Sequence, residues 1–104
     1  MSQAKTVKEF LVAAQWILEN KGWCQGYYRK NAAGQHVYVD ADAASFCSIG
    51  ALWAVEAASP HLLREAETLL SKIVKKDVIM WNDTPGRTKE EILNVFEQAI
   101  KEAT

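Results

Sequence analysis

The stretch that decides the fold is Ala43–Val55, AASFCSIGALWAV, the longest weakly polar run in the chain. Its side chains are apolar on nearly every face of a helix, which is typical of a helix surrounded by others. Gly50 costs about 1 kcal/mol of helix propensity relative to alanine, which close packing by a neighbour can offset. We therefore expect a central buried helix here, capped at its start by Asp40 or Asp42.

Further helices are predicted on both sides of this run. One starts at the capping box Thr6–Glu9 and ends before Gly22, another starts at Ser59–Pro60, and the last starts at a capping box formed by Thr88 and Glu91. Their apolar stripes are Phe10, Ala13, Ala14, Ile17 and Leu18; Leu62, Leu63, Ala66, Leu69, Leu70, Ile73 and Val74; and Ile92, Leu93, Val95, Phe96, Ala99 and Ile100.

A short hairpin is predicted between the first helix and the central one. Tyr27 and Tyr28 precede a polar loop at 31–34, and His36–Val39 follows with the alternation of a strand. Such a hairpin is marginal alone, so it should lean on the helices. The predicted fold class is mainly α (α+β), with about four helices around a buried second helix and a short β-hairpin between helices one and two.

Composition favours a single compact domain over residues 1–104, because 104 residues with 49% hydrophobic content can enclose one core. Twelve basic and thirteen acidic side chains give a net charge of −1, so the net charge provides no electrostatic attraction to nucleic acid or to an anionic membrane. There is no signal-peptide pattern and no run of about 20 apolar residues. We expect a cytoplasmic protein that does not contact membranes and for which nucleic acid is not a favoured partner.

Cysteine and tryptophan usage points to structural roles. Two cysteines without secretory features are expected to be free thiols, and four tryptophans are expected mainly in the core. A metal site would have to combine Cys24, His36, Cys47 and His61, which lack the short paired spacings of zinc modules. We therefore predict no metal and no cofactor.

The segment Trp81–Thr88, WNDTPGRT, combines an aromatic anchor, a turn and a helix start. Pro85 and Gly86 suit the two central positions of a type II turn. Asp83 and Arg87 straddle the turn, where they could form an ion pair, while Asp and Asn side chains also brace turns on their own backbone.

A ligand could instead bind here, with Arg87 offered to a phosphate or carboxylate. The hairpin tyrosines are candidates to complete such a site. The predicted ligand-binding residues are Trp81, Asn82, Asp83, Arg87, Tyr27 and Tyr28.

Two other readings remain open. Cys47, near a helix start, could be the nucleophile of a hydrolase or transferase with His36, His61 or Asp83 as partner, although its apolar neighbours favour a buried structural cysteine. The run Tyr27–Lys30 has the aromatic and basic residues of a weak single-stranded nucleic-acid binder.

Three motifs carry a resemblance to a known family. They are Gly22–Gly26 (GWCQG), Phe46–Leu52 (FCSIGAL) and Trp81–Thr88, and together they span most of the chain. On them the chain resembles a family of small, functionally uncharacterised bacterial and phage proteins. The resemblance implies a shared fold, an origin in bacteria or their viruses and a host-directed interaction, and it transfers no catalytic residue.

Together these observations favour a non-enzymatic module over an enzyme. We expect it to recognise a protein partner or a small anionic ligand, and a homo-oligomer is compatible with its amphipathic helices.

Overall fold

The structure, a computed structural model, describes residues 3–57 and 59–103, and within them it contains five helices and one small sheet. The predicted class, mainly helical with a hairpin between helices one and two, is confirmed, and a short helix that includes the start of the 81–88 segment is added to the four predicted. In chain order the elements are α1 (Val7–Asn20), β1 (Arg29–Lys30), the 3-10 turn η1 (Asp40–Asp42), β2 (Ser45–Phe46), α2 (Ser48–Ala54), α3 (His61–Val74), α4 (Val78–Asn82) and α5 (Lys89–Glu102).

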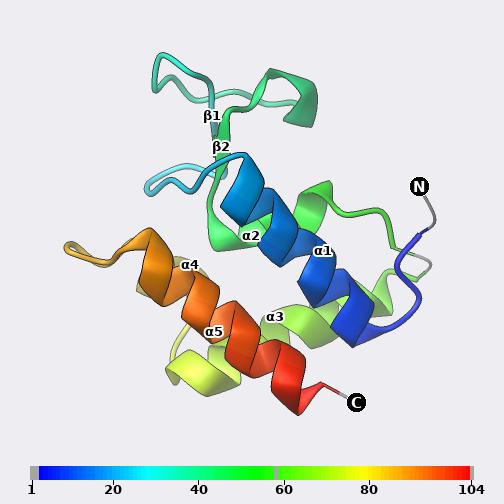
Figure 1. Cartoon of the computed structure of the whole chain (residues 1–104). Helices are drawn as coiled ribbons and strands as arrows, with labels where there is room; N and C mark the ends of the chain where they lie inside the picture. The colour runs from blue at the N-terminus through cyan, green and yellow to red at the C-terminus, as the bar shows by residue number, and fades with distance from the viewer. Residues whose placement is uncertain (1–2, 58, 104) are drawn as a thin grey trace.

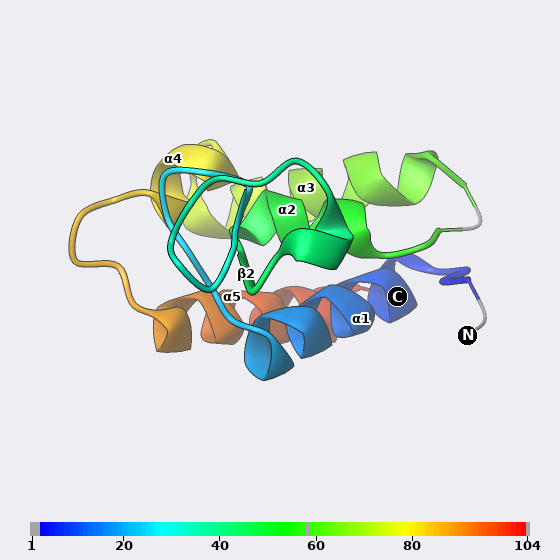
Figure 2. The same ribbon diagram turned by 90° about the horizontal axis from the view of Figure 1, so that it is seen from above.

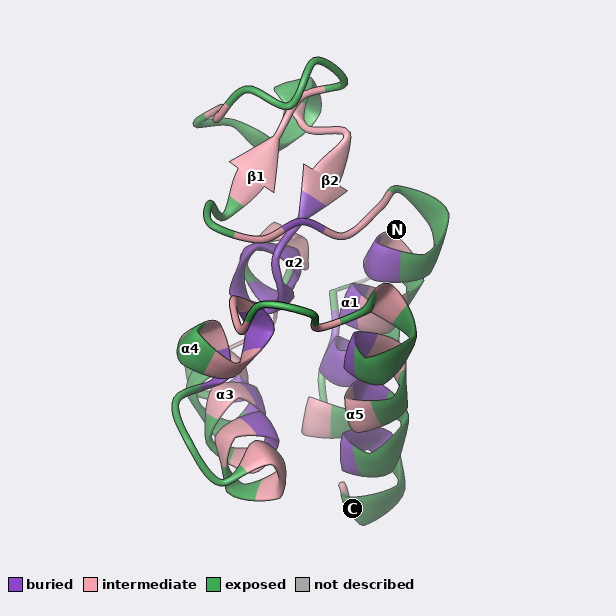
Figure 3. Cartoon of the chain, turned by 90° about the vertical axis from the view of Figure 1, so that its left-hand side faces the viewer, coloured by how far each residue is buried: buried purple, intermediate pink, exposed green. Residues whose placement is uncertain are grey.

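The helices form two layers (Figures 1 and 2). Helices α1 and α5 lie side by side in one layer, and α2, α3 and α4 form the other. Figure 3 shows the buried surfaces of the helices facing one another between the layers, with the hairpin standing at one end beside α2. The largest buried apolar side chains in this core are Phe10, Leu11, Leu18, Phe46, Ile49, Leu52, Leu70, Ile92 and Phe96.

Helix α1 follows the prediction except in one detail of its cap. The Thr6 hydroxyl accepts a hydrogen bond from the Glu9 amide at 3.1 Å, as in a capping box. The Glu9 carboxylate, however, accepts from the Lys5 amide at 2.8 Å, so the reciprocal bond is made one residue earlier. The helix ends before Gly22, whose φ of 141° lies outside the range that other residues readily adopt.

The hairpin lies where it was predicted, but its second strand was wrongly assigned. Arg29 pairs with Phe46 and Lys30 with Ser45, whereas His36 forms one isolated bridge to Lys30. The Asn31 side chain accepts from the amides at positions 33 and 35, and this tight loop returns Val37 to β1, where its amide donates to the Arg29 carbonyl at 3.2 Å. The ladder goes no further there because Tyr38 and Val39 are exposed, whereas Phe46 in the observed strand is buried in the core.

The central helix is shorter than predicted because part of the apolar run is extended. Helix α2 starts after Cys47, whose Sγ accepts from the Gly50 amide at 3.3 Å. The expected caps, Asp40 and Asp42, lie instead in η1. Phe46, the residue before Cys47, exchanges backbone hydrogen bonds with Gly22 and Cys24 and pairs with β1. These bonds to distant segments keep Phe46 extended, although the sequence pattern predicts a helix there. Residues 48–52 of α2 are buried, as expected of a central helix.

The expectation that the tryptophans lie mainly in the core is wrong. Trp16 and Trp53 are 57% and 42% exposed, while Trp23 and Trp81 are half-buried. Phenylalanine, leucine and isoleucine fill the narrow space between the two layers. The indoles are therefore left at the edges and on the surface.

The segment that joins α4 to α5 has the predicted turn and cap. The Arg87 amide donates to the Thr84 carbonyl at 3.1 Å, and Gly86 has a φ of 85°. Thr88 and Glu91 form the reciprocal capping box of α5. The preceding α4 is a short helix whose start is held by the Asp77 carboxylate, which accepts from two backbone amides.

Candidate functional site

The centre of the candidate site is Asn82, the last residue of α4, which is fully buried. Its Oδ1 accepts hydrogen bonds from Trp23 Nε1 at 2.8 Å and from the Ser48 amide and hydroxyl at 3.0 and 2.7 Å. Its Nδ2 donates to the Cys24 carbonyl at 3.2 Å and to Asp83 Oδ1 at 3.0 Å. One amide thereby joins α4, the start of α2 and the loop after α1, and both of its polar atoms are satisfied.

The loop after α1 adds further hydrogen bonds to this junction. Gln25 Nε2 donates to the carbonyls of Asn82 and Thr84, both at 2.9 Å, and the Gly26 amide donates to Asp83 Oδ1 at 3.0 Å. These partners lie 57 to 59 positions apart along the chain. Gln25 lies in the GWCQG motif, but its partners could not be predicted from a local pattern.

Trp81 and Arg87 form a separate contact at the turn. The Arg87 guanidinium carbon lies 4.1 Å from the centre of the Trp81 ring, and its Nε donates to the Trp81 carbonyl at 3.1 Å. Its Nη1 donates to Glu91 at 3.1 Å, and the Thr88 amide together with Arg87 lowers the pKa of that carboxyl. Of the two possibilities for Asp83, the ion pair with Arg87 is not formed, because the guanidinium is paired with Glu91 of the α5 cap.

A pocket of about 220 Å³ adjoins the Asn82 junction. Three of the six predicted ligand-binding residues, Tyr27, Tyr28 and Asp83, line it together. The other three lie in the junction or at the turn. The complete lining is Gly26, Tyr27, Tyr28, His36, Cys47, Ile79 and Asp83.

Aromatic rings gather around this pocket and extend from it across the surface. The rings of Tyr27 and His36 are stacked with centres 4.8 Å apart, and Tyr38 continues from His36 at 4.5 Å. Tyr28 meets Trp53 at 4.4 Å. Tyr38 is 81% exposed, and Tyr27 is half-exposed. We call these five residues, Tyr27, Tyr28, His36, Tyr38 and Trp53, the aromatic face.

Charges of both signs surround the aromatic face. Arg29 forms an ion pair with Asp40 at 2.5 Å. The Lys30 ammonium lies 5.5 Å from the centre of the Tyr27 ring. Asp83 forms no salt bridge with any residue in the described part of the chain, although its Oδ1 accepts two hydrogen bonds. The face is therefore close to neutral, with one carboxylate in its pocket.

The two cysteines are buried free thiols, as expected. Burial raises the pKa of the Cys47 thiol to about 11, although hydrogen bonds from the Gly50 and Ile49 amides oppose this shift. Burial also raises the pKa of Cys24. Cys47 and His36 line the same pocket without a hydrogen bond between them, since the imidazole is stacked on tyrosine instead.

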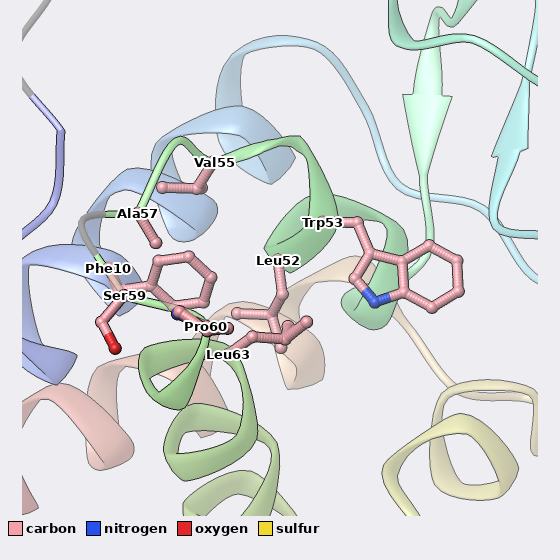
Figure 4. A pocket seen from close by; sticks show the side chains of 8 residues that line it. All are labelled: Phe10, Leu52, Trp53, Val55, Ala57, Ser59, Pro60 and Leu63. Atoms are coloured by element: carbon pink, nitrogen blue, oxygen red, sulfur yellow. The ribbon is translucent and has the colours of Figure 1, made fainter.

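A second pocket, of about 240 Å³, lies at the other end of α2 (Figure 4). It is mainly apolar, and Trp53 stands at one edge of it. Because Trp53 also contacts Tyr28, this ring pair connects the two pockets. The lining residues are Phe10, Leu52, Trp53, Val55, Ala57, Ser59, Pro60 and Leu63.

Within residues 3–57 and 59–103, no three His, Cys, Asp or Glu side chains gather in a way that could hold a metal ion. His61 is exposed at the start of α3, away from the lining of the first pocket. No helix in the described part of the chain is long and apolar enough to cross a membrane.

Fold and site together define a small, mainly helical protein with an aromatic-lined surface pocket. The chain belongs to a family of unknown function, DUF6197, whose model matches residues 2–102. This confirms the resemblance drawn from the three motifs. The motifs meet in space, since Gly22–Gly26, Phe46–Leu52 and Trp81–Thr88 all contribute to the Asn82 junction or its pocket. No curated protein and no solved structure matches the chain.

Proposed function

We propose that the chain is a non-enzymatic binding module that recognises a protein partner through the aromatic face. The observation that supports this most is the exposure of Tyr38, Tyr27 and Trp53 around a pocket. Tyrosine and tryptophan are enriched at the centres of protein interfaces, where they bury large areas at a small cost in side-chain entropy. A face of such rings is therefore better suited to a partner surface than to water.

Pocket size favours a partner side chain over a free metabolite. Pockets for small-molecule ligands and cofactors measure about 300–1,000 Å³. The two pockets here measure about 220 and 240 Å³, which is smaller than that range. Each can take one or two side chains, and the Tyr28–Trp53 pair lies between them.

Charge favours a protein over a nucleic acid or a small anion. Binding to phosphates requires several lysines or arginines that are not already neutralised. On this face Arg29 is paired with Asp40, and Asp83 lines the pocket, which leaves Lys30 as the one cation without a salt bridge among Tyr27–Lys30. At the turn, Arg87 is paired with Glu91. Neither place offers the excess positive charge that an anion needs.

The proposal includes a cytoplasmic location in a bacterium or in a bacterium infected by a phage. Two buried, unpaired thiols suit a reducing compartment. The resemblance to bacterial and phage proteins supports the origin and a host-directed partner.

Thermal unfolding of the tagged protein in an extract of the organism that encodes it tests this function. A partner that binds the native state raises the unfolding midpoint. We expect the extract to raise the midpoint of the wild type and of Trp16→Ala, an exposed tryptophan of α1 outside both pockets, but not that of Tyr38→Ala. Tyr38→Ala should leave the midpoint in buffer unchanged, because its side chain is exposed. A shift that survives Tyr38→Ala and Trp53→Ala but is lost in Trp16→Ala would contradict the proposal.

A second candidate, a cysteine-dependent hydrolase or transferase, is favoured by one observation. Cys47, His36 and Asp83 line the same pocket, and these are the residue types of a nucleophile, a base and an orienting acid. The burial of the thiol and its raised pKa oppose this reading, because a reactive cysteine needs a stabilised thiolate.

Thiol labelling distinguishes the two candidates. In Cys24→Ser, the binding module predicts that Cys47 reacts with iodoacetamide at neutral pH only as fast as the protein unfolds. The enzyme predicts fast labelling that His36→Ala slows. His61→Ala serves as the control, since His61 lies outside the pocket lining.

A further inference from the structure

We propose that the 220 Å³ pocket receives a lysine or arginine side chain of the partner, with Asp83 as the counter-charge. This inference rests on the proposed function and specifies the chemistry that the aromatic face recognises. It follows from the combination of aromatic walls with an acidic side chain in one small pocket.

The walls of the pocket have the chemistry of a cation site. Tyr27, Tyr28 and His36 line it, and the face of a tyrosine ring attracts a cation placed within about 6 Å. The Tyr27 ring is already stacked on His36 and has the Lys30 ammonium 5.5 Å from its centre, so the ring that a guest cation contacts is Tyr28. Lysine and arginine also bring an apolar stem that can pack beside Ile79.

Asp83 is held in place for this role. Its Oδ1 accepts from the Gly26 amide and from Asn82 Nδ2, both at 3.0 Å, and these bonds fix the carboxylate at the pocket. Its other oxygen accepts no hydrogen bond from the residues that the structure describes. A carboxylate with one oxygen fixed and the other uncommitted can accept a charge-assisted hydrogen bond from an ammonium or guanidinium group.

The other charges near the pocket set the sign of the expected effects. Arg29 is paired with Asp40, so this pair contributes little net charge. Lys30 repels a second cation, and Asp83 attracts it. A cationic guest therefore binds more weakly without Asp83 and more tightly without Lys30, whereas an anionic guest shows the reverse.

Titration followed by amide NMR tests the inference with defined probes. The probes are the blocked amino-acid amides of arginine and lysine, with citrulline as the neutral isostere of arginine and glutamate as the anionic control. We expect arginine and lysine to shift the amide signals of Gly26, Tyr27 and Asp83, and citrulline and glutamate to have little effect. In Asp83→Asn the affinity should fall by about tenfold, the size expected for one charge-assisted bond.

The variants keep the test independent of folding. Asp83→Asn retains the Oδ1 that accepts from Gly26 and Asn82, so its unfolding midpoint should match the wild type. Lys30→Gln should raise the affinity for arginine. Equal binding of citrulline and arginine, or an affinity that Asp83→Asn leaves unchanged or increases, would overturn the inference. If the inference fails but the extract still raises the unfolding midpoint in a way that depends on Tyr38, the proposed function stands. If the extract does not raise the midpoint, the proposed function itself is rejected.

Discussion

Asn82 shows how one side chain can fix the geometry of a surface site from inside the protein. Its oxygen accepts from Trp23 and Ser48, and its nitrogen donates to Cys24 and Asp83. An amide in the interior is costly unless its hydrogen bonds are made, and here they are. The same residue places the Asp83 carboxylate at the pocket, so the core and the site share one residue.

Replacing Asn82 with alanine should therefore destabilise the protein strongly. The change leaves buried donors and acceptors of Trp23, Ser48 and Cys24 without partners, at about 1–3 kcal/mol for each unsatisfied group, so we expect a total loss of about 3–5 kcal/mol. Urea unfolding measures this loss. The control is Asn94→Ala on the exposed side of α5, which should change the free energy of unfolding by less than about 0.5 kcal/mol. Similar results for both variants would show that the junction is not a source of stability.

Cys47 makes a prediction about alkaline pH. Its pKa is raised by burial from 9.0 to about 11, so the unfolded thiol loses its proton first as the pH rises. Its contribution to stability is thus complete below about pH 9 and is lost between pH 9 and about pH 11, by at most about 1.4 kcal/mol per pH unit. Urea midpoints measured across this range should fall more steeply in the wild type than in Cys47→Ser, which retains an oxygen to cap α2. Parallel slopes would mean that Cys47 is not titrating from a buried state.

Helix α2 and the hairpin depend on Gly50 for their close approach. A Cβ placed at Gly50 would lie 2.1 Å from the Tyr28 carbonyl oxygen, so any side chain must push the Tyr28 backbone away. The Cys47 amide donates to the same carbonyl at 3.0 Å. Because Gly50 has no side chain, the backbone of Tyr28, a residue that lines the pocket, can lie directly against α2.

Gly50→Ala should destabilise the protein even though alanine is the better helix former. Overpacking costs about 1–3 kcal/mol, and a Cβ 2.1 Å from a backbone oxygen favours the upper end of that range. This cost exceeds the gain of about 1 kcal/mol in helix propensity. Thermal unfolding provides the measurement, and Thr68→Ala on the exposed side of α3 is the matched control. We expect the control to be neutral or slightly stabilising. A more stable Gly50→Ala protein would show that Tyr28 can move away at little cost.

At the scale of the elements, local chemistry explains what the sequence predicts well. The caps at Thr6 and Thr88 and the turn at Gly86 involve neighbours within four positions, so their signals are continuous in the sequence. The pairing of Phe46 with Arg29 depends on a distant segment, and it converts the start of an apparently helical run into a strand. Periodicity alone cannot distinguish these outcomes for a short apolar run.

Only part of the candidate site could be predicted, because residue type can be read from the sequence and contacts between distant segments cannot. Tyr27, Tyr28 and Asp83 stand out by residue type and do line one pocket. Asn82 stands out as well, but its burial and its partners follow from tertiary packing. The contact of Trp53 with Tyr28 could not be predicted, because the two rings are far apart in the chain. His36 was considered only as a base or a metal ligand, and its stacking on Tyr27 follows from the hairpin that the sequence predicts.

At the scale of the whole molecule, the two helical layers leave two of the four indoles, Trp16 and Trp53, on the surface, while Trp23 and Trp81 pack against the core. The core between α1/α5 and α2/α3/α4 is filled by aliphatic side chains and phenylalanines, while the aromatic face projects beside the hairpin. No side-chain nitrogen or oxygen buried in the described part of the chain lacks a hydrogen-bond partner. Large exposed apolar side chains also occur singly at Val12, Trp16 and Met80, whereas those of the aromatic face are grouped around a pocket. This grouping supports the aromatic face as the proposed binding face.

Site-specific photo-crosslinking in the cells that encode the protein tests that claim most directly. A photoreactive phenylalanine in place of Tyr38, which is 81% exposed, should form a discrete adduct with one protein, and the adduct should disappear when Trp53→Ala is added. The same group in place of Trp16 on α1 should give no such adduct. A heterologous adduct identifies the partner, and an adduct of twice the chain's mass identifies a second copy. Crosslinking from position 16 alone, or equally from both positions, would contradict the assignment of the aromatic face as the binding surface.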